Sequence, residues 1–162
     1  MNLKIILVFI SCLTLLNCAD VKKEKDTKVK SYKTSLYSDL EGNAVAIEDF
    51  KGKRILLNFW ATWCTPCLQE MPSMVKAQEI LKNEDYVFLF ATTDSNSKIR
   101  DFKKNSKYPF QFLQFNSTLD KLNIYALPAT FVYDTQGNKV KRFDGATEWD
   151  SEEMLHQLRA IK

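Results

Sequence analysis

Apolar runs and helical spacing alternate along the chain beyond residue 34. Residues 54–60 are almost continuously apolar, which is typical of a central strand buried on both faces, and residues 86–91 repeat this pattern. The intervening residues 66–82 place apolar side chains at helical spacing. This order predicts two parallel strands joined by a crossover helix.

Turn residues divide the rest of this region into shorter elements. A glycine-containing turn lies near its beginning and another near its end, and each predicts a β-hairpin. In chain order we predict a hairpin at 36–46, a helix at 97–105, an irregular or extended segment at 108–115, a short helix or turn at 119–125, a hairpin formed by 129–133 and 139–143, and a helix that begins at Asp150 with Glu153 in its capping box. The expected fold class is α/β, with a mixed central sheet, helices on both of its faces and an N-terminal β-hairpin.

The first residues of the chain resemble a bacterial export signal. Lys4 precedes an apolar run at residues 5–16 that is too short to span a bilayer, as in a signal peptide. Cys18 then completes a sequence that resembles the lipobox of bacterial lipoproteins, although Asn17 stands where a small residue is usual. We therefore predict a lipoprotein signal peptide at 1–17 and lipidation of Cys18. The alternative is an ordinary thiol that follows a signal-peptidase cut.

A charged segment follows the predicted lipidation site. Residues 18–33 are dominated by Lys, Glu and Asp with almost nothing to bury, which predicts a solvated tether. Residues 34–162 form the predicted domain. The net charge of +3 is spread over 23 basic and 20 acidic residues without a basic stripe, so nothing indicates binding of nucleic acid.

Two cysteines separated by two residues are the clearest candidates for covalent chemistry. Cys64 and Cys67 stand at the junction between the predicted strand at 54–60 and the predicted helix at 66–82. A helix N-terminus stabilises a thiolate, and residues three apart in a helix share one face. We therefore expect Cys64 to be the exposed nucleophile and Cys67 the resolving thiol of a reversible disulfide.

Three other interpretations of the cysteine pair compete with a reversible disulfide. A permanent structural disulfide across so small a loop would add little stability. Half of a zinc site would need further Cys or His ligands, and His156 is the only histidine of the chain, so we expect no metal site. Chance pairing of two buried thiols is the third.

The sequence around the cysteines resembles the active site of the thioredoxin superfamily. The residues that carry this likeness are WCTPC at 63–67, preceded by LNFWAT at 57–62. Asn58, the lipoprotein-like start and the run EMP at 70–72 are similar to the membrane-anchored TlpA/ResA branch. The resemblance implies a thioredoxin-like fold over residues 35–162 and thiol–disulfide exchange outside the cytoplasm.

The resemblance also implies further site residues. In this superfamily a cis-proline faces the cysteines, and Leu127-Pro128 occupies the matching position, where the Leu127 backbone would pair with an extended substrate. In the ResA branch a glutamate at the position of Glu70 is the acid–base residue, here placed to serve Cys67. The alternative is a solvated glutamate that only favours the helix dipole. The remaining expected substrate contacts are Trp63, Thr65 and Pro66.

Other aromatic residues are assigned to the core or left without a role. We expect Trp60 and the aromatic residues of 110–115 to pack in the core, although Phe110, Phe112 and Phe115 could instead line a groove near the site. His156 is expected on the surface of the last helix. The sequence suggests no role for Trp149.

The predicted function is reduction of protein disulfides, with the Cys64–Cys67 disulfide as the redox centre and no separate cofactor. Thr65-Pro66 between the cysteines resembles reductants more than strong oxidants. The expected partners are protein disulfides such as those of apocytochrome c, a membrane electron donor that recharges the pair, and the membrane itself, reached by a periplasm-facing monomer through Cys18. The alternatives are a thiol peroxidase and a non-catalytic lipoprotein that binds a partner.

Overall fold

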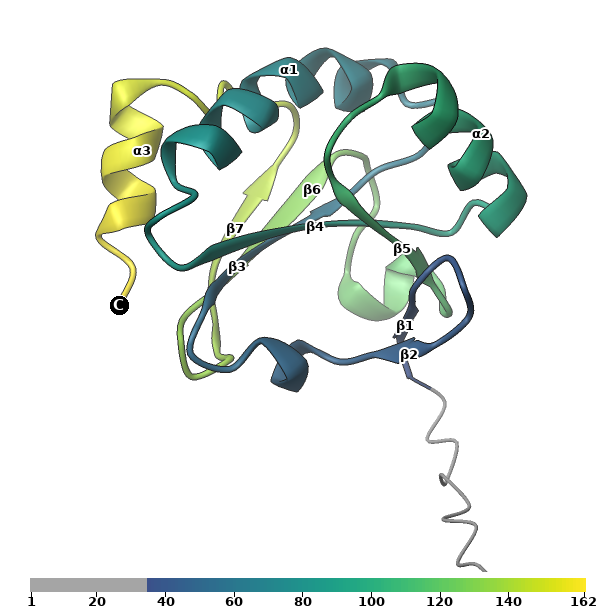
Figure 1. The fold of residues 1–162 in the computed structure, drawn as a ribbon, viewed down its shortest axis with the longest axis horizontal. Coiled ribbons are helices and arrows are strands. Elements are labelled where there is room, and N and C mark those ends of the chain that lie inside the picture. The colour runs from purple at the N-terminus through teal and green to yellow at the C-terminus, as the bar shows by residue number, and fades with distance from the viewer. Residues whose placement is uncertain (1–34) are drawn as a thin grey trace, which may run out of the picture. The chain divides into compact units, whose positions relative to one another are not determined.

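A seven-stranded mixed sheet forms the centre of the domain (Figure 1). The computed structural model describes residues 35–162, so the predicted signal peptide, Cys18 and the tether lie outside the described residues. The strands, in their order across the sheet, are β2 (Ala44–Val45), β1 (Tyr37–Ser38), β5 (Gln111–Phe115), β4 (Tyr86–Thr92), β3 (Arg54–Phe59), β6 (Ala129–Tyr133) and β7 (Lys139–Asp144).

The three central strands run parallel and are joined by helices. Helix α1 (Thr65–Ile80) connects β3 to β4, and α2 (Asn96–Ser106) connects β4 to β5. Both connections step in the same direction across the sheet, so right-handed crossovers place both helices on one face. Helix α3 (Glu152–Arg159) follows the antiparallel pair β6–β7, which was predicted as a hairpin and lies at one edge of the sheet.

Alternate side chains of β4 enter two apolar clusters on opposite faces of the sheet. Phe88 and Phe90 belong to the cluster under the α-helices, to which α1, α2 and α3 all contribute. Leu89 and Ala91 belong to the other cluster, which is covered by the 3₁₀ helices η1 (Ile47–Phe50) and η2 (Leu119–Leu122). Helical elements thus cover both faces, as predicted, but the α-helices pack on one of them.

The segment at 108–115, predicted as irregular or extended, contains strand β5. This strand pairs in parallel with β4 and antiparallel with β1. Phe112 and Leu113 are buried in opposite clusters, so the sequence lacks the apolar–polar alternation that marks a half-buried strand. Phe110, Phe112 and Phe115 are all buried, which confirms the core assignment.

The predicted start of the last helix is wrong by one residue. Ser151 is the N-cap of α3, and its hydroxyl oxygen accepts the backbone N–H of Met154 at 3.3 Å. Asp150 instead forms an ion pair with Lys76 of α1 at 2.9 Å, so the Asp150 carboxylate is directed at α1 and does not cap α3. Trp60 is buried and His156 is exposed, as predicted. In the part of the chain that the structure describes, no helix has the length and apolar character needed to cross a membrane.

Candidate active site

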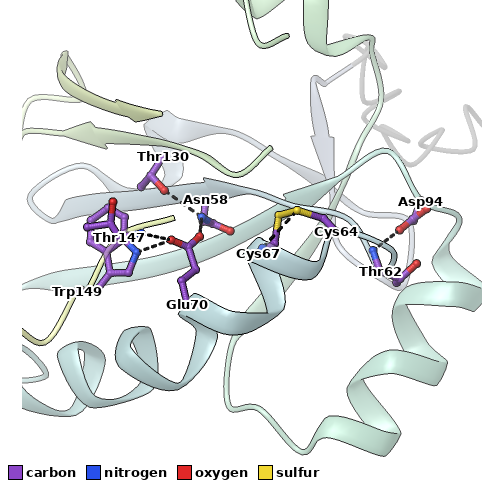
Figure 2. The surroundings of a disulfide bond; sticks show 9 residues. All are labelled: Asn58, Thr62, Cys64, Cys67, Glu70, Asp94, Thr130, Thr147 and Trp149. Carbon is purple, nitrogen blue, oxygen red and sulfur yellow. Dashed lines mark hydrogen bonds between the residues drawn. A yellow bond between two sulfur atoms is a disulfide. The ribbon is translucent and has the colours of Figure 1, made fainter. Parts of the chain in front are cut away.

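The cysteine pair lies where β3 ends and α1 begins (Figure 2). Cys64 is the N-cap of α1, and its sulfur accepts the backbone N–H of Cys67 at 3.3 Å. The two sulfurs are joined in a disulfide, with the Cα atoms 5.3 Å apart. When this bond is reduced, the Cys64 sulfur stands at the positive end of a helix, a position that favours the thiolate.

The expectation that Cys64 is exposed is wrong for this disulfide form. Its residue surface is 4% accessible and that of Cys67 is 1% accessible. Both cysteines belong to the apolar cluster beneath the α-helices, and packing in this cluster covers them. The pair is therefore embedded in the domain rather than displayed on a protruding loop.

Glu70, one helical turn after Cys67, is a buried carboxylate with three hydrogen-bond donors. Its residue surface is 4% accessible. Oε1 accepts the side-chain amide of Asn58 at 2.9 Å. Oε2 accepts both the backbone N–H of Thr147 at 3.0 Å and the indole Nε1–H of Trp149 at 2.9 Å. The alternative of a solvated glutamate is therefore wrong.

Opposing effects set the acidity of Glu70. Burial raises the pKa of this carboxyl above its ordinary value, because the anion loses water. The hydrogen bonds from Trp149, Thr147 and Asn58 act in the opposite direction but do not cancel the effect of burial on the pKa. Among the described residues, no salt bridge includes Glu70. A raised pKa moves the titration of the Glu70 carboxyl closer to neutral pH, where the group can both accept and release a proton.

Asn58 is itself fixed by two neighbouring strands. Its side-chain Nδ2 donates to Glu70 and also to the hydroxyl of Thr130 at 2.9 Å. Asn58 and Thr130 are directly opposed in the antiparallel pair β3–β6. The orientation of this amide is thus set by the register of the sheet.

The peptide bond between Leu127 and Pro128 is cis, as the resemblance implied. Pro128 immediately precedes β6, and the first residue of β6, Ala129, is paired with Phe59 at the end of β3. The proline therefore lies beside the carboxyl end of β3, from which the chain continues to the cysteines.

Comparison with known proteins agrees with this geometry. Residues 22–142 match the AhpC/TSA family. The thiol-disulfide oxidoreductase ResA of Bacillus subtilis is 31% identical over 158 residues, which cover 94% of this chain and 86% of ResA. ResA of Geobacillus thermodenitrificans is 35% identical over 129 residues, or 77% and 72% of the two chains. The exposed lipoprotein thioredoxin Etrx1 of Streptococcus pneumoniae superposes with a TM-score of 0.65 at 26% identity, covering 76% of this chain and 96% of Etrx1.

The chain belongs to the AhpC/TSA family. Its relatives and its Cys64–Cys67 disulfide identify it as a thioredoxin-like thiol–disulfide oxidoreductase. The resemblance to the ResA branch is thereby confirmed.

The loop that precedes the cysteines is held by Asp94, a residue that the sequence did not reveal. The carboxylate of Asp94 accepts the backbone N–H of Thr62 at 2.8 Å, and the Asp94 N–H donates to the hydroxyl of Thr92 at 3.1 Å. Asp94 follows β4, so this contact joins the end of β4 to the loop between β3 and α1. In Figure 2 it lies on the side of the disulfide opposite Glu70.

Trp149 is the second residue of the site that the sequence analysis missed. It is fully buried, and its indole N–H makes the contact with Glu70 described above. Its backbone N–H donates to the hydroxyl of Ser73 on α1 at 3.2 Å. A signal for this role was absent, because a tryptophan in a loop 79 positions from Glu70 shows no periodic relation to it.

The predicted substrate contacts are divided between exposed and buried positions. Trp63 is 71% exposed beside the cysteines, and Thr65 and Pro66 are also exposed at the start of α1. Pro128 is buried, and Leu127 packs against both apolar clusters.

Within residues 35–162, no group of three or more His, Cys, Asp or Glu side chains could hold a metal ion. That the disulfide is the only redox group of the enzyme stays a prediction.

Proposed function

We propose that this oxidoreductase works outside the cytoplasm as a lipid-anchored reductase of protein disulfides, with Cys64 as nucleophile, Cys67 as resolving thiol and Glu70 as proton-transfer group. The observation that carries the proposal is the Cys64–Cys67 disulfide at a helix N-terminus, one turn from a buried carboxylate.

The first step is a thiol–disulfide exchange between Cys64 and the substrate. The Cys64 thiolate attacks a substrate disulfide, forms a mixed disulfide with one substrate sulfur and releases the other as a thiolate. Trp63 and the backbone of Leu127 are the proposed contacts of the substrate segment, the latter by strand-like pairing beside Pro128.

The second step releases the substrate. The Cys67 thiol gives its proton to Glu70 and attacks the Cys64 sulfur, which forms the Cys64–Cys67 disulfide and frees the second substrate sulfur. Two electrons pass from the cysteine pair to the substrate, and the proton on Glu70 is passed on to the departing thiolate or to water. The location of Glu70 one turn after Cys67, on the same helix face, supports this role.

The proposed direction is reduction. Thr65-Pro66 between the cysteines resembles reductants, and an oxidising compartment requires that the pair be recharged, for which we propose a membrane electron donor. We propose apocytochrome c and other exported proteins with wrongly formed disulfides as substrates.

Anchoring through Cys18 is supported by the lipobox-like sequence and by the likeness to an exposed lipoprotein of S. pneumoniae. Intact mass of the membrane-extracted protein tests it. We expect a mature chain that begins at Cys18 and carries acyl groups; a chain that begins elsewhere, or without acyl mass, contradicts the anchor.

The redox potential of the pair tests the proposed direction. Full-length protein is equilibrated with glutathione or dithiothreitol buffers, and the free thiols are counted. We expect a value near that of thioredoxin, about −270 mV, whereas a value near about −120 mV would indicate an oxidant. A pair that these thiols cannot reduce would favour a non-catalytic binding protein, and rapid consumption of hydroperoxide would favour a peroxidase.

A further inference from the structure

Trp149 has a polar contact that its packing does not require. The indole ring is fully buried and lies edge-on against Phe143, with ring centroids 5.3 Å apart. A purely apolar ring could fill much of the same space. The N–H of this side chain, however, is directed at Oε2 of Glu70, 2.9 Å away.

The three donors divide unequally between the two carboxylate oxygens of Glu70. Oε2 accepts two hydrogen bonds, from Trp149 and Thr147, and Oε1 accepts one, from Asn58. Two N–H groups directed at one oxygen stabilise negative charge there and oppose a proton on it. Figure 2 shows Trp149 and Thr147 on one side of the carboxylate and Asn58 on the other, toward the disulfide.

The charged groups near Glu70 do not account for this asymmetry. The side chains of β3 and β6 that belong to this hydrogen-bond network are Asn58 and Thr130, and both are neutral. Lys76 shares a surface pocket with Glu70, but its ammonium group is paired with a loop carboxylate. The charged groups that line this pocket with Glu70 are Lys76 of α1 and Glu148 and Asp150 of the loop after β7, and the nearest cysteines, Cys64 and Cys67, are joined in a disulfide.

We propose that Trp149 is a positioning residue whose indole N–H anchors Oε2 of Glu70 and leaves Oε1, on the cysteine side, as the oxygen that takes up and releases the proton. The inference rests on the proposed role of Glu70 and adds the side chain that orients it. Without the N–H, burial remains while one bond to the anion is lost, so the carboxyl binds its proton more tightly.

A matched pair of substitutions isolates the N–H. Trp149→Phe keeps a buried aromatic ring and removes the donor. Trp60→Phe is the control, because Trp60 is 1% exposed in the same apolar cluster and its Nε1 has no hydrogen-bond partner among residues 35–162. If Trp149→Phe does not fold, benzothienylalanine incorporated at position 149 retains the bicyclic ring and lacks the N–H.

The first readout is the titration of Glu70 itself, followed by carbon-13 NMR of its side-chain carboxyl in the oxidised full-length protein. We expect Trp149→Phe to move the midpoint upward by about one pH unit, the effect of losing one charge-assisted hydrogen bond. Trp60→Phe should leave it in place. An unchanged midpoint in a folded Trp149→Phe protein overturns the inference.

The second readout separates this inference from the proposed function. The rate of disulfide exchange is measured against pH in the wild type, in Trp149→Phe, and in Glu70→Gln with and without Trp149→Phe. We expect Trp149→Phe to move the profile upward in pH, and to leave it unmoved when Glu70 is already Gln. A moved carboxyl midpoint with an unmoved exchange profile would support the role of Trp149 and reject proton transfer by Glu70. A moved profile in the Glu70→Gln background would overturn the inference, because Trp149 would then act through another group.

Discussion

The site has two halves that are built in different ways. The thiol half, residues 64–67, is formed by four consecutive residues at the start of one helix. The carboxylate half consists of Glu70 and its donors Asn58, Thr147 and Trp149, which are 12, 77 and 79 positions away in sequence. The thiol half depends on where one helix begins, whereas the carboxylate half exists only when the loop after β7 lies against α1.

The reactive sulfurs and the carboxylate proposed to transfer their proton are therefore specified by different parts of the structure. Local spacing is enough to bring two sulfurs together, because the first turn of a helix sets their distance. A buried carboxylate with a raised pKa needs a closed apolar surrounding and donors from several elements. We therefore expect changes in the thiol half to remove activity, and changes in the carboxylate half to alter its rate and pH dependence.

The largest expected effect is that of Cys64→Ser. A hydroxyl cannot replace the thiolate as nucleophile, so we expect the reduction of insulin disulfides to fall roughly a thousandfold or more. Cys67→Ser should retain the first step and accumulate a mixed disulfide with the substrate, detectable by mass spectrometry. If the trapped mixed disulfide involves Cys67 instead, the assigned order of the two cysteines is reversed.

Glu70→Gln is expected to have the second largest effect. The amide cannot carry the proton. Its NH₂ group would also replace one carboxylate oxygen and so place a donor against another donor, either Asn58 or the Trp149–Thr147 pair. We expect disulfide exchange to slow about tenfold to a hundredfold and to lose the part of its pH dependence that belongs to this carboxyl. Glu79→Gln, at an exposed position of the same helix, is the control and should leave the rate unchanged. Equal rates for Glu70→Gln and wild type across the pH range would reject proton transfer by Glu70.

The same comparison shows which parts of the fold and of the site can be predicted from the sequence. The motif at 63–67 and the order of strands and helices predicted the fold and the thiol half, and the resemblance predicted Glu70 and the cis bond at Pro128. Trp149 and Asp94 were missed because both act from loops, and loops show no periodicity that reveals which backbone or side chain they will reach. Strand β5 was predicted only as part of an irregular or extended segment for a related reason, since burial on both faces removes the alternating pattern.

Stability against pH provides a smaller test of the carboxylate half. Because folding raises the pKa of Glu70 above its ordinary 4.5, the folded protein binds this proton more tightly than the unfolded chain does. The contribution of this group to stability is therefore fully present below pH 4.5 and is lost as the pH rises through the folded-state pKa. We expect the melting temperature of wild type, relative to that of Glu70→Gln, to fall as the pH rises through this interval. A constant difference between the two proteins would indicate that burial does not perturb Glu70.

The smallest expected effect concerns the tertiary anchor of the thiol half. Asp94→Ala removes the acceptor of the Thr62 N–H, and we expect it to lower the free energy of unfolding by about 1 kcal/mol. Asp94→Asn retains a side-chain oxygen as acceptor and should recover most of this loss. Since Asp94 and Glu70 lie on opposite sides of the disulfide in Figure 2, Asp94→Ala should leave the pH profile that belongs to Glu70 unchanged. A shift of that profile would show that the two halves respond as one unit, because movement of the loop before Cys64 would then have reached the carboxylate through α1.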